Sequence, residues 1–180
     1  IVFAFGGDDL ISTGPGNDWV FAGAGNDQIF AGDGNDWVFA GTGNDVASGG
    51  NGNDFLYGEA GNDVLDGGRG SDIVDGGSGS DTLIFTDAER GELDRYIGGS
   101  GQDSLVLEFA AGRWADAAVK AEVRAYLDFL AAGSTGNFTF TTMNLVVSSV
   151  ETLVVKVDGA IIDPRAGGNT APTGAADSYT

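Results

Sequence analysis

The 180-residue chain contains no cysteine and no histidine, and only one methionine and three prolines. Without cysteine or histidine it cannot build a disulfide framework, a thiol nucleophile, an ordinary zinc site or a Ser-His-Asp triad. Basic residues are also scarce, because 8 lysines and arginines stand against 27 aspartates and glutamates, giving a formal charge of −19. Such a charge opposes phosphate backbones, so we expect no nucleic-acid partner. No apolar run approaches the roughly 18 residues of a membrane span.

What the chain does have is glycine, with 32 residues, arranged in a repeat. From Ala4 to Ile84 it divides into nine consecutive nonapeptides, whose fourth position is always glycine and whose eighth is always apolar. A tenth unit covers residues 98–106 and is separated from the ninth by an insertion at residues 85–97. The sixth position of all ten units is aspartate, at Asp9, Asp18, Asp27, Asp36, Asp45, Asp54, Asp63, Asp72, Asp81 and Asp103.

This spacing predicts a coiled arrangement that places acids above one another. The glycine-rich half of each unit can form a tight turn, and the remainder can form a short strand whose middle side chain points inward. If two units make one coil and coils stack at about 4.8 Å, aspartates two units apart lie on the same edge. Stacked carboxylates repel one another unless a divalent ion lies between them. Calcium suits such a site better than magnesium, because calcium accepts six to eight oxygens in flexible geometry.

The nonapeptide closely resembles the RTX, or haemolysin-type calcium-binding, repeat GGxGxDxUx, over residues 1–106. The resemblance implies a mainly β fold, a calcium-loaded parallel β-roll with a C-terminal α+β cap. It also implies that each ion lies between turns two units apart and binds one aspartate from each turn. Main-chain carbonyls complete the site, from positions two and four of the first turn and positions one and three of the second.

Carried onto this chain, the resemblance implies seven calcium ions, in the pairs Asp9–Asp27, Asp27–Asp45, Asp45–Asp63, Asp63–Asp81, Asp18–Asp36, Asp36–Asp54 and Asp54–Asp72. An eighth ion, between Asp72 and Asp103, requires residues 85–97 to loop out. Eight ions would add +16 to the −19 of the chain, leaving about −3, so composition and site count agree.

The carbonyl ligands that the resemblance implies come from the glycine-rich turns. Two turns depart from the pattern, because Phe5 and Glu59 replace the second glycine and lose its backbone freedom. The carbonyl ligands are those of Phe5, Gly7, Gly14, Gly16, Ala22, Gly23, Ala24, Gly25, Ala31, Gly32, Asp33, Gly34, Ala40, Gly41, Thr42, Gly43, Gly49, Gly50, Asn51, Gly52, Gly58, Glu59, Ala60, Gly61, Gly67, Gly68, Arg69, Gly70, Gly76, Ser78, Gly98 and Ser100.

The outward positions of the even-numbered units predict an aromatic face. Soluble proteins rarely leave such a patch bare, so another segment of the polypeptide or a second copy is expected to cover it. The alternative is a binding surface for sugar rings or for a cell-surface partner, since aromatic faces bind flat apolar surfaces. The residues concerned are Trp19, Phe21, Trp37, Phe39, Phe55 and Tyr57.

Beyond the repeats, residues 107–160 predict a cap over the open end of the roll. Trp114–Ala132 is typical of an amphipathic helix, with Gly133 as its C-cap. Strands are expected at Leu105–Phe109, Asn137–Thr141, Leu145–Val147 and Glu151–Val157. This part resembles segments that follow RTX blocks in large secreted bacterial adhesins. Residues 161–180 are expected to be a linker and the start of a following adhesin-type repeat.

Together these features predict a calcium-binding module of a secreted bacterial adhesin, located outside the cell or at its surface. The resemblance implies folding on calcium binding outside the cell and support of type I secretion. Besides calcium, the expected partners are neighbouring domains of one long chain, because the sequence starts in mid-repeat. The alternatives are a calcium-dependent carbohydrate- or cell-surface-binding module and a non-catalytic appendage of a secreted enzyme. We expect no catalysis and no membrane span.

Overall fold

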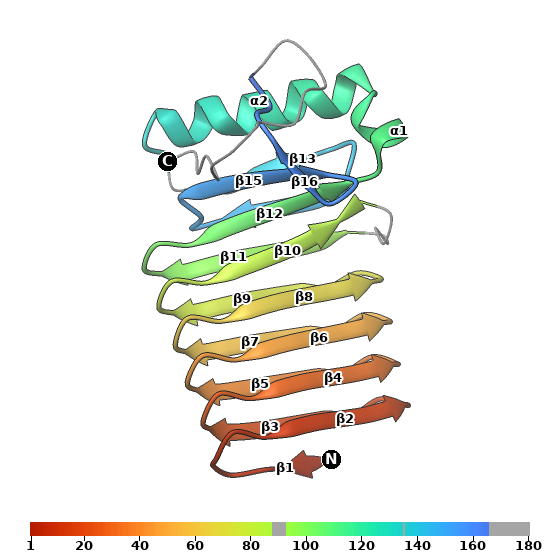
Figure 1. Cartoon of the computed structure of the whole chain (residues 1–180), viewed down its shortest axis with the longest axis vertical. Coiled ribbons are helices and arrows are strands. Elements are labelled where there is room, and N and C mark those ends of the chain that lie inside the picture. Colours follow the sequence, from red (N-terminus) through yellow and green to blue (C-terminus); the bar gives the residue numbers. More distant parts are fainter. Residues whose placement is uncertain (88–92, 135, 166–180) are drawn as a thin grey trace.

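The computed structural model describes residues 1–87, 93–134 and 136–165, which form a parallel β-roll closed by a small cap (Figure 1). The predicted mainly β fold with a parallel roll is confirmed. Two sheets face each other, each with eight strands. The first contains, in spatial order, β1 (Val2–Phe3), β3 (Trp19–Ala24), β5 (Trp37–Thr42), β7 (Phe55–Ala60), β9 (Ile73–Ser78), β11 (Asp94–Ser100), β14 (Leu145–Ser148) and β13 (Phe138–Phe140). The second contains β16 (Ala160–Ile162), β15 (Thr152–Val157), β12 (Ser104–Phe109), β10 (Thr82–Thr86), β8 (Val64–Arg69), β6 (Val46–Asn51), β4 (Gln28–Asp33) and β2 (Leu10–Pro15).

The register of the strands follows the repeat, with each residue paired to the one two units further on. Val20 pairs with Val38 in the first sheet, and Ile29 pairs with Ala47 in the second. The eighth position of each unit therefore forms an inward column, and Val20, Val38 and Ile29 are completely buried. These columns, together with the buried alanines Ala22, Ala31 and Ala40, form the thin hydrophobic core between the two sheets of the roll.

The turns need glycine because successive coils lie in close contact. Gly41 has a φ of 115° and Gly43 a φ of 132°, both in the left-handed region that side chains disfavour. A Cβ atom at either position would also overlap a carbonyl oxygen of the coil beneath, that of Gly23 or Gly25. The two departures from the pattern adopt the same conformation without glycine, with φ values of 74° at Phe5 and 70° at Glu59.

The structure corrects the prediction that residues 85–97 are an insertion outside the roll. β11 begins at Asp94 and pairs in parallel with β9, in the register Arg95↔Ile73. Leu93 to Ile97 therefore supplies the second half of a further repeat unit, which has only four extra residues because Asp94 follows Asp72 by 22 residues instead of 18. The cause is hydrophobic, since Tyr96 occupies the inward eighth position and is only 1% exposed.

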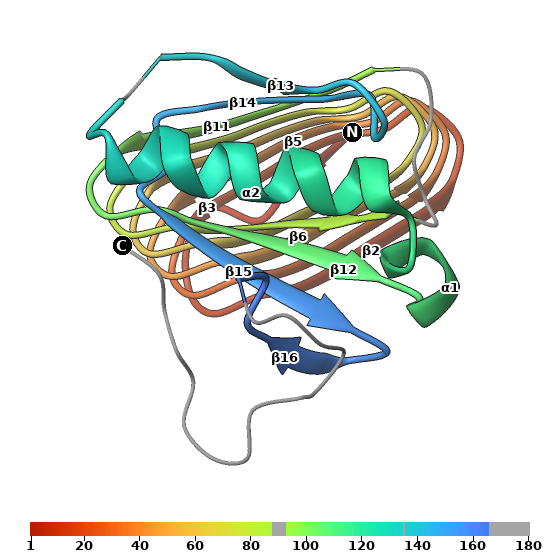
Figure 2. The ribbon, with the colours of Figure 1, turned by 90° about the horizontal axis from the view of Figure 1, so that it is seen from above.

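The cap extends both sheets and adds two helices. β14 pairs in parallel with β11, and β15 pairs in parallel with β12, so each sheet gains one more strand in the roll's direction. β13 and β16 then end the two sheets in antiparallel pairing. Figure 2 shows α2 (Ala117–Ala131) lying across the open end of the roll. Its buried side chains are Val119, Val123, Tyr126 and Leu127.

The predicted helix at Trp114–Ala132 is corrected in its first turn. Trp114 ends a separate four-residue helix, α1 (Ala111–Trp114), and α2 starts only at Ala117. The break lies at Asp116, whose extended backbone and carboxylate, which accepts the Ala118 N–H at 2.8 Å, form an N-cap. At the other end Gly133 has a φ of 68° and donates its N–H to the Leu130 carbonyl, as expected of a C-terminal glycine.

The last predicted segment, residues 161–180, lies largely outside the described residues. Ile161 and Ile162 belong to β16, a strand that the sequence did not predict. Arg165 is the last residue that the structure describes, so the rest of the predicted linker and the following adhesin-type repeat lie outside the described residues. Among the described residues, no helix is both long and apolar enough to cross a membrane.

Candidate metal centre

The repeat aspartates form two ladders, one along each edge of the roll. In each ladder the main-chain N–H of one aspartate donates to Oδ1 of the aspartate one coil further on, at 2.7–2.9 Å. One ladder contains Asp9, Asp27, Asp45, Asp63, Asp81 and Asp103, and the other contains Asp18, Asp36, Asp54, Asp72 and Asp94. The stacking that the spacing predicts is thus present, with nine successive pairs.

In nine of these eleven aspartates the second carboxylate oxygen has no hydrogen-bond partner in the protein. Oδ2 is buried and accepts no hydrogen bond at Asp9, Asp27, Asp36, Asp45, Asp54, Asp63, Asp72, Asp81 and Asp103. A buried carboxylate oxygen without a partner is costly, and here the cost recurs at every coil. Such a regular set of orphaned oxygens is explained by a ligand that supplies positive charge between the coils.

Burial and mutual repulsion raise the pKa values of several ladder aspartates. Burial raises the pKa of Asp54 to about 7, with smaller raising contributions from the negative charges of Asp72 and Asp36. Asp63 is raised to about 7 in the same way, and burial raises the pKa of Asp72 to about 6. In each case the N–H donated by the preceding aspartate only partly offsets this shift. In the protein alone the charged form of these carboxylates is therefore disfavoured near neutral pH, and a bound cation would stabilise it.

Carbonyl oxygens converge on the same space. A Cβ atom built on Gly49 would overlap Oδ2 of Asp54 and lie 2.6 Å from the carbonyl oxygen of Gly67, which occupies position one of the next coil. Gly58 repeats this arrangement one unit later, with Oδ2 of Asp63 and the carbonyl oxygen of Gly76. Each site thus has a carboxylate and a carbonyl facing one small gap, an all-oxygen donor set that fits a hard cation such as calcium.

The carbonyls of positions two and four also face the following coil. The carbonyl oxygens of Gly50 and Gly52 lie where a Cβ on Gly68 or Gly70 would overlap them. Position-three carbonyls each accept one backbone hydrogen bond, as in Gly52 N–H to the Arg69 carbonyl at 2.7 Å, and retain a second lone pair. The carbonyl ligands expected from the resemblance therefore remain a prediction that this geometry fits.

The structure corrects one aspartate pair and adds residues that the sequence analysis missed. Asp103 lies over Asp81, not over Asp72, and the partner of Asp72 is Asp94. The carbonyls of Gly77 and Gly79 consequently join the site between Asp81 and Asp103, since Cβ atoms on Gly99 and Gly101 would overlap them. The missed signal was the string Leu93 to Ile97, which carries aspartate and an inward apolar residue at positions six and eight.

A second ladder, also missed, runs beside each aspartate ladder at position five. Asn35 N–H donates to Oδ1 of Asn17 at 2.9 Å, and Asn53 N–H donates to Oδ1 of Asn35 at the same distance. At the first coil Asp8 takes this role by accepting the N–H of Asn26 at 2.7 Å. These side chains bond the backbone of the next coil, so position five holds the turns together.

The predicted aromatic face is present as two columns of stacked rings. Trp19, Trp37 and Phe55 form one column, with centroids 5.0 Å and 4.2 Å apart and planes inclined by 3° and 16°. Phe21 and Phe39 lie 4.9 Å apart in the other, which continues to Tyr57. Trp19 is 42% exposed, and no described residue outside the roll's own strands stacks on these rings.

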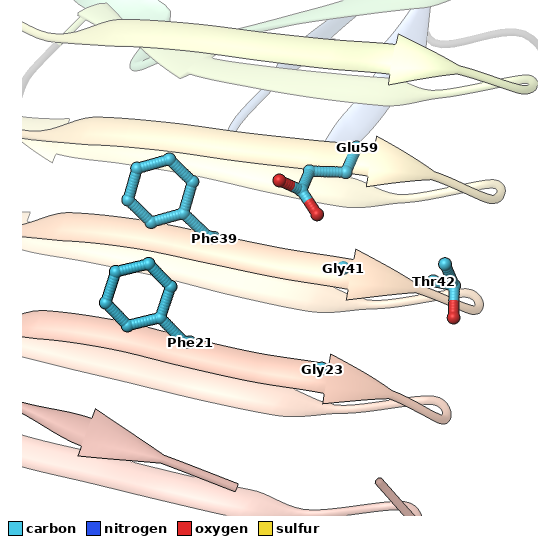
Figure 3. A pocket seen from close by; sticks show the side chains of 6 residues that line it. All are labelled: Phe21, Gly23, Phe39, Gly41, Thr42 and Glu59. Carbon is cyan, nitrogen blue, oxygen red and sulfur yellow. The ribbon is translucent and has the colours of Figure 1, made fainter. Parts of the chain in front are cut away.

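A hollow of about 380 Å³ runs beside the phenylalanine column, lined by Phe21, Gly23, Phe39, Gly41, Thr42 and Glu59. Figure 3 shows the rings of Phe21 and Phe39 one above the other, with the Glu59 side chain reaching toward Phe39 from the next strand. Glycines deepen the surface here because they add no side chain next to the rings. The hollow therefore combines two aromatic side chains with one carboxylate.

Comparison with known protein families gives one match. The family model for the RTX calcium-binding nonapeptide repeat matches four overlapping copies, at residues 3–38, 12–47, 30–65 and 48–83. This span contains the repeat aspartates from Asp9 to Asp81, while Asp94 and Asp103 lie beyond it. No curated protein matches the chain.

Proposed function

Residues 3–83 are RTX calcium-binding nonapeptide repeats, and from this premise we propose that the chain is a calcium-dependent folding module of a secreted bacterial adhesin. Repeats of this family bind calcium. The observation that carries the proposal is the set of buried Oδ2 atoms that have no hydrogen-bond partner. Divalent cations between the coils would neutralise them and turn the repulsion within each ladder into attraction.

The register supports a proposed count of nine ions, one for each pair of successive aspartates. Eight of these pairs have the second turn within the described residues. The ninth pair is Asp72 with Asp94, and residues 88–92, which precede Asp94 in the sequence, lie outside the described part of the chain. Nine ions would add +18 to the formal charge of −19.

Calcium would then decide where the chain folds. Because the sites do not exist in the unfolded chain, the free energy of binding becomes free energy of folding. Calcium is scarce in the cytosol and abundant outside the cell, so the proposed module stays unfolded during export and folds after it. This fits passage through a type I secretion system and assembly at the cell surface. The absence of cysteine fits as well, since such folding needs no oxidation.

The test is circular dichroism of the whole chain during a calcium titration, with magnesium as the control. We expect β structure to appear cooperatively with calcium and to disappear with a chelator. Magnesium should be much less effective, because it requires octahedral geometry and retains its water. A chain that is fully folded without calcium, or that folds equally well with magnesium, would contradict the proposal.

We also propose that the module has no catalytic role of its own, whether in an adhesin or as an appendage of a secreted enzyme. Every repeat aspartate is engaged in its ladder, so these carboxylates are structural. This part of the proposal is tested by assaying the calcium-loaded chain against glycoside and ester substrates, because any turnover contradicts it.

A second candidate function is carbohydrate binding at the aromatic columns. The supporting observation is that the parallel rings of Trp19 and Trp37 stack 5.0 Å apart in an exposed column, while the neighbouring column borders a hollow that Phe21, Phe39 and Glu59 line. Tryptophan fluorescence separates the possibilities. A response to added glycans supports binding, whereas a response to dilution alone indicates that a second copy covers the face.

A further inference from the structure

The aspartate ladder that starts at Asp9 does not end at Asp103, because a cap residue takes the next rung. The Asp103 N–H donates to Oε2 of Glu151 at 2.8 Å, as the Asp81 N–H donates to Oδ1 of Asp103 at the same distance. The register agrees, since Ser104 pairs with Thr152 and thereby places Glu151 one coil beyond Asp103. Glu151 thus presents its carboxylate where a following repeat would present its aspartate.

Ser149 supplies the matching carbonyl. In the coil before, a Cβ on Gly76 would overlap Oδ2 of Asp81 and lie 2.6 Å from the carbonyl oxygen of Gly98. One coil later, a Cβ on Gly98 would lie 2.7 Å from Oδ2 of Asp103 and would overlap the carbonyl oxygen of Ser149. Ser149 adopts a φ of 53°, a left-handed conformation unusual for serine. Two donors of the repeat site are therefore reproduced by residues outside the repeat.

A buried acceptor points into this gap. Asp103 is completely buried, and its Oδ2 has no hydrogen-bond partner. The described parts of the chain contain no ion pair to Asp103 or Glu151, so the two carboxylates face each other without a compensating cation. Two neighbouring carboxylates repel each other, and a cation bound between them would offset this repulsion.

The gap differs from the repeat sites by being open on one side. Three residues, Ser149 to Glu151, connect β14 to β15. In the preceding coil a glycine-rich turn occupies the corresponding place, and β11 includes part of that turn. Positions two to four of the Asp103 turn consequently have no following turn above them, and Gly99 and Gly101 are exposed. Their carbonyls can face a bound ion on one side while water completes its shell. Calcium tolerates such a mixed shell.

We propose that Asp103, Glu151 and the Ser149 carbonyl hold one more calcium ion, which joins the cap to the last coil of the roll. The ligands are Oδ2 of Asp103, the carboxylate of Glu151 and the main-chain oxygens of Ser149, Gly99 and Gly101, together with water. This inference rests on the proposed calcium loading of the roll and adds a site that the repeat does not encode. The ion fixes β14 and β15 on the roll, so folding of the roll and docking of the cap become one event.

The test variant is Glu151→Gln, because glutamine keeps the oxygen that accepts the Asp103 N–H while it removes the charge. Asp128→Asn is the matched control, since it removes one charge from an exposed position on α2, at a side chain that is 79% exposed. Calcium bound per chain is measured on the full chain by equilibrium dialysis. We expect the Glu151→Gln chain to bind one ion fewer than the wild type, and the Asp128→Asn chain to bind as many as the wild type. An undiminished count in Glu151→Gln overturns the inference.

Anomalous diffraction from calcium-loaded crystals of the wild-type chain provides a second readout, which decides the matter even if the Glu151→Gln chain fails to fold. A peak enclosed by Asp103, Ser149 and Glu151 supports the cap site. If peaks appear between the repeat aspartates but none appears beside Asp103 and Glu151, the cap site is overturned and the proposed function stays intact. A chain that binds no calcium anywhere fails both.

Discussion

Asp54 donates its main-chain N–H to Oδ1 of Asp72 at 2.9 Å, while its own Oδ2 is buried without a partner. The same relationship recurs along both edges of the roll, so every inner aspartate faces two coils. One carboxylate oxygen binds the backbone of the coil before, and the other is left for a ligand toward the coil that follows. Each inner aspartate therefore bonds the backbone of a neighbouring coil and also offers an oxygen to the proposed calcium ion.

Replacing Asp54 with asparagine should remove more calcium than replacing Asp9. Asp54 faces sites on both sides, with Asp36 and Asp72, whereas Asp9 begins its ladder and faces only Asp27. We expect Asp54→Asn to lose two ions and Asp9→Asn one, as counted by equilibrium dialysis. The midpoint of the calcium titration should rise more for Asp54→Asn. Equal losses in the two variants would refute the sharing of aspartates between sites.

The calcium-free roll should be more stable at acidic than at neutral pH. The folded pKa of Asp54 and Asp63 is about 7, above the ordinary value of 3.8, so the folded state takes up protons as pH falls. Their stabilising contribution is fully present below pH 4 and is lost as pH rises through 7. Circular dichroism of chelated protein should show more β structure at pH 5 than at pH 8. A signal that falls between pH 8 and pH 5 would contradict this.

Calcium loading should follow the opposite trend and release protons. Where the calcium-free roll is folded, its carboxylates must lose their protons before they bind calcium, so affinity should decrease as pH falls through 7 and 6, the pKa values of Asp54 and Asp72. Titration calorimetry in two buffers of different ionisation enthalpy measures the released protons directly. Identical heats in both buffers would mean that the sites are already ionised before calcium binds.

Glu59→Gly should stabilise the calcium-loaded protein. Glu59 is the second residue of its repeat unit and has a φ of 70°. Glycine adopts this left-handed conformation without strain, so the substitution should stabilise the folded protein by about 1 kcal/mol. Its carbonyl remains available as a ligand in the variant. Glu59→Gln is the control, because it removes the charge and keeps the strained backbone. Thermal unfolding in saturating calcium should show a higher Tm for the Glu59→Gly variant only. A similar rise in Tm in both variants would assign the effect to the lost charge.

Leu65→Ala should destabilise the loaded roll by about 2–5 kcal/mol. Leu65 is completely buried in the inward column, and the residue paired with it on one side is Ala47, which already leaves this coil thin. Val46→Ala is the control, since Val46 points outward from the neighbouring strand and is 42% exposed. Urea unfolding in saturating calcium measures both changes. Similar losses in the two variants would show that the column does not carry the core.

The nonapeptide spacing was sufficient to predict the roll, both aspartate ladders and the aromatic columns from the sequence. A strict period leaves little freedom, because every ninth residue meets the same constraints of turn, strand and core. The carboxylate stack follows from the same period, and so does the need for a cation between coils.

Other features had no period to reveal them. The break before α2 depends on the single carboxylate of Asp116, and β16 is a three-residue strand that forms only by pairing with β15. The register after Thr86 depends on whether Tyr96 or Leu105 follows Val74 in the inward column, and only packing decides in favour of Tyr96. Glu151 carries no repeat signature at all.

The chain's sequence alone therefore determined which residues repeat, which of them point inward and which acids must be neutralised. Only the tertiary structure decided which acids are neighbours at the end of the roll, where Asp94 replaces Asp103 as the partner of Asp72 and Glu151 follows Asp103. The physical reason is that local turn and strand geometry is encoded within nine residues. The pairing of one coil with the next is instead settled by the burial of side chains that lie far apart along the chain.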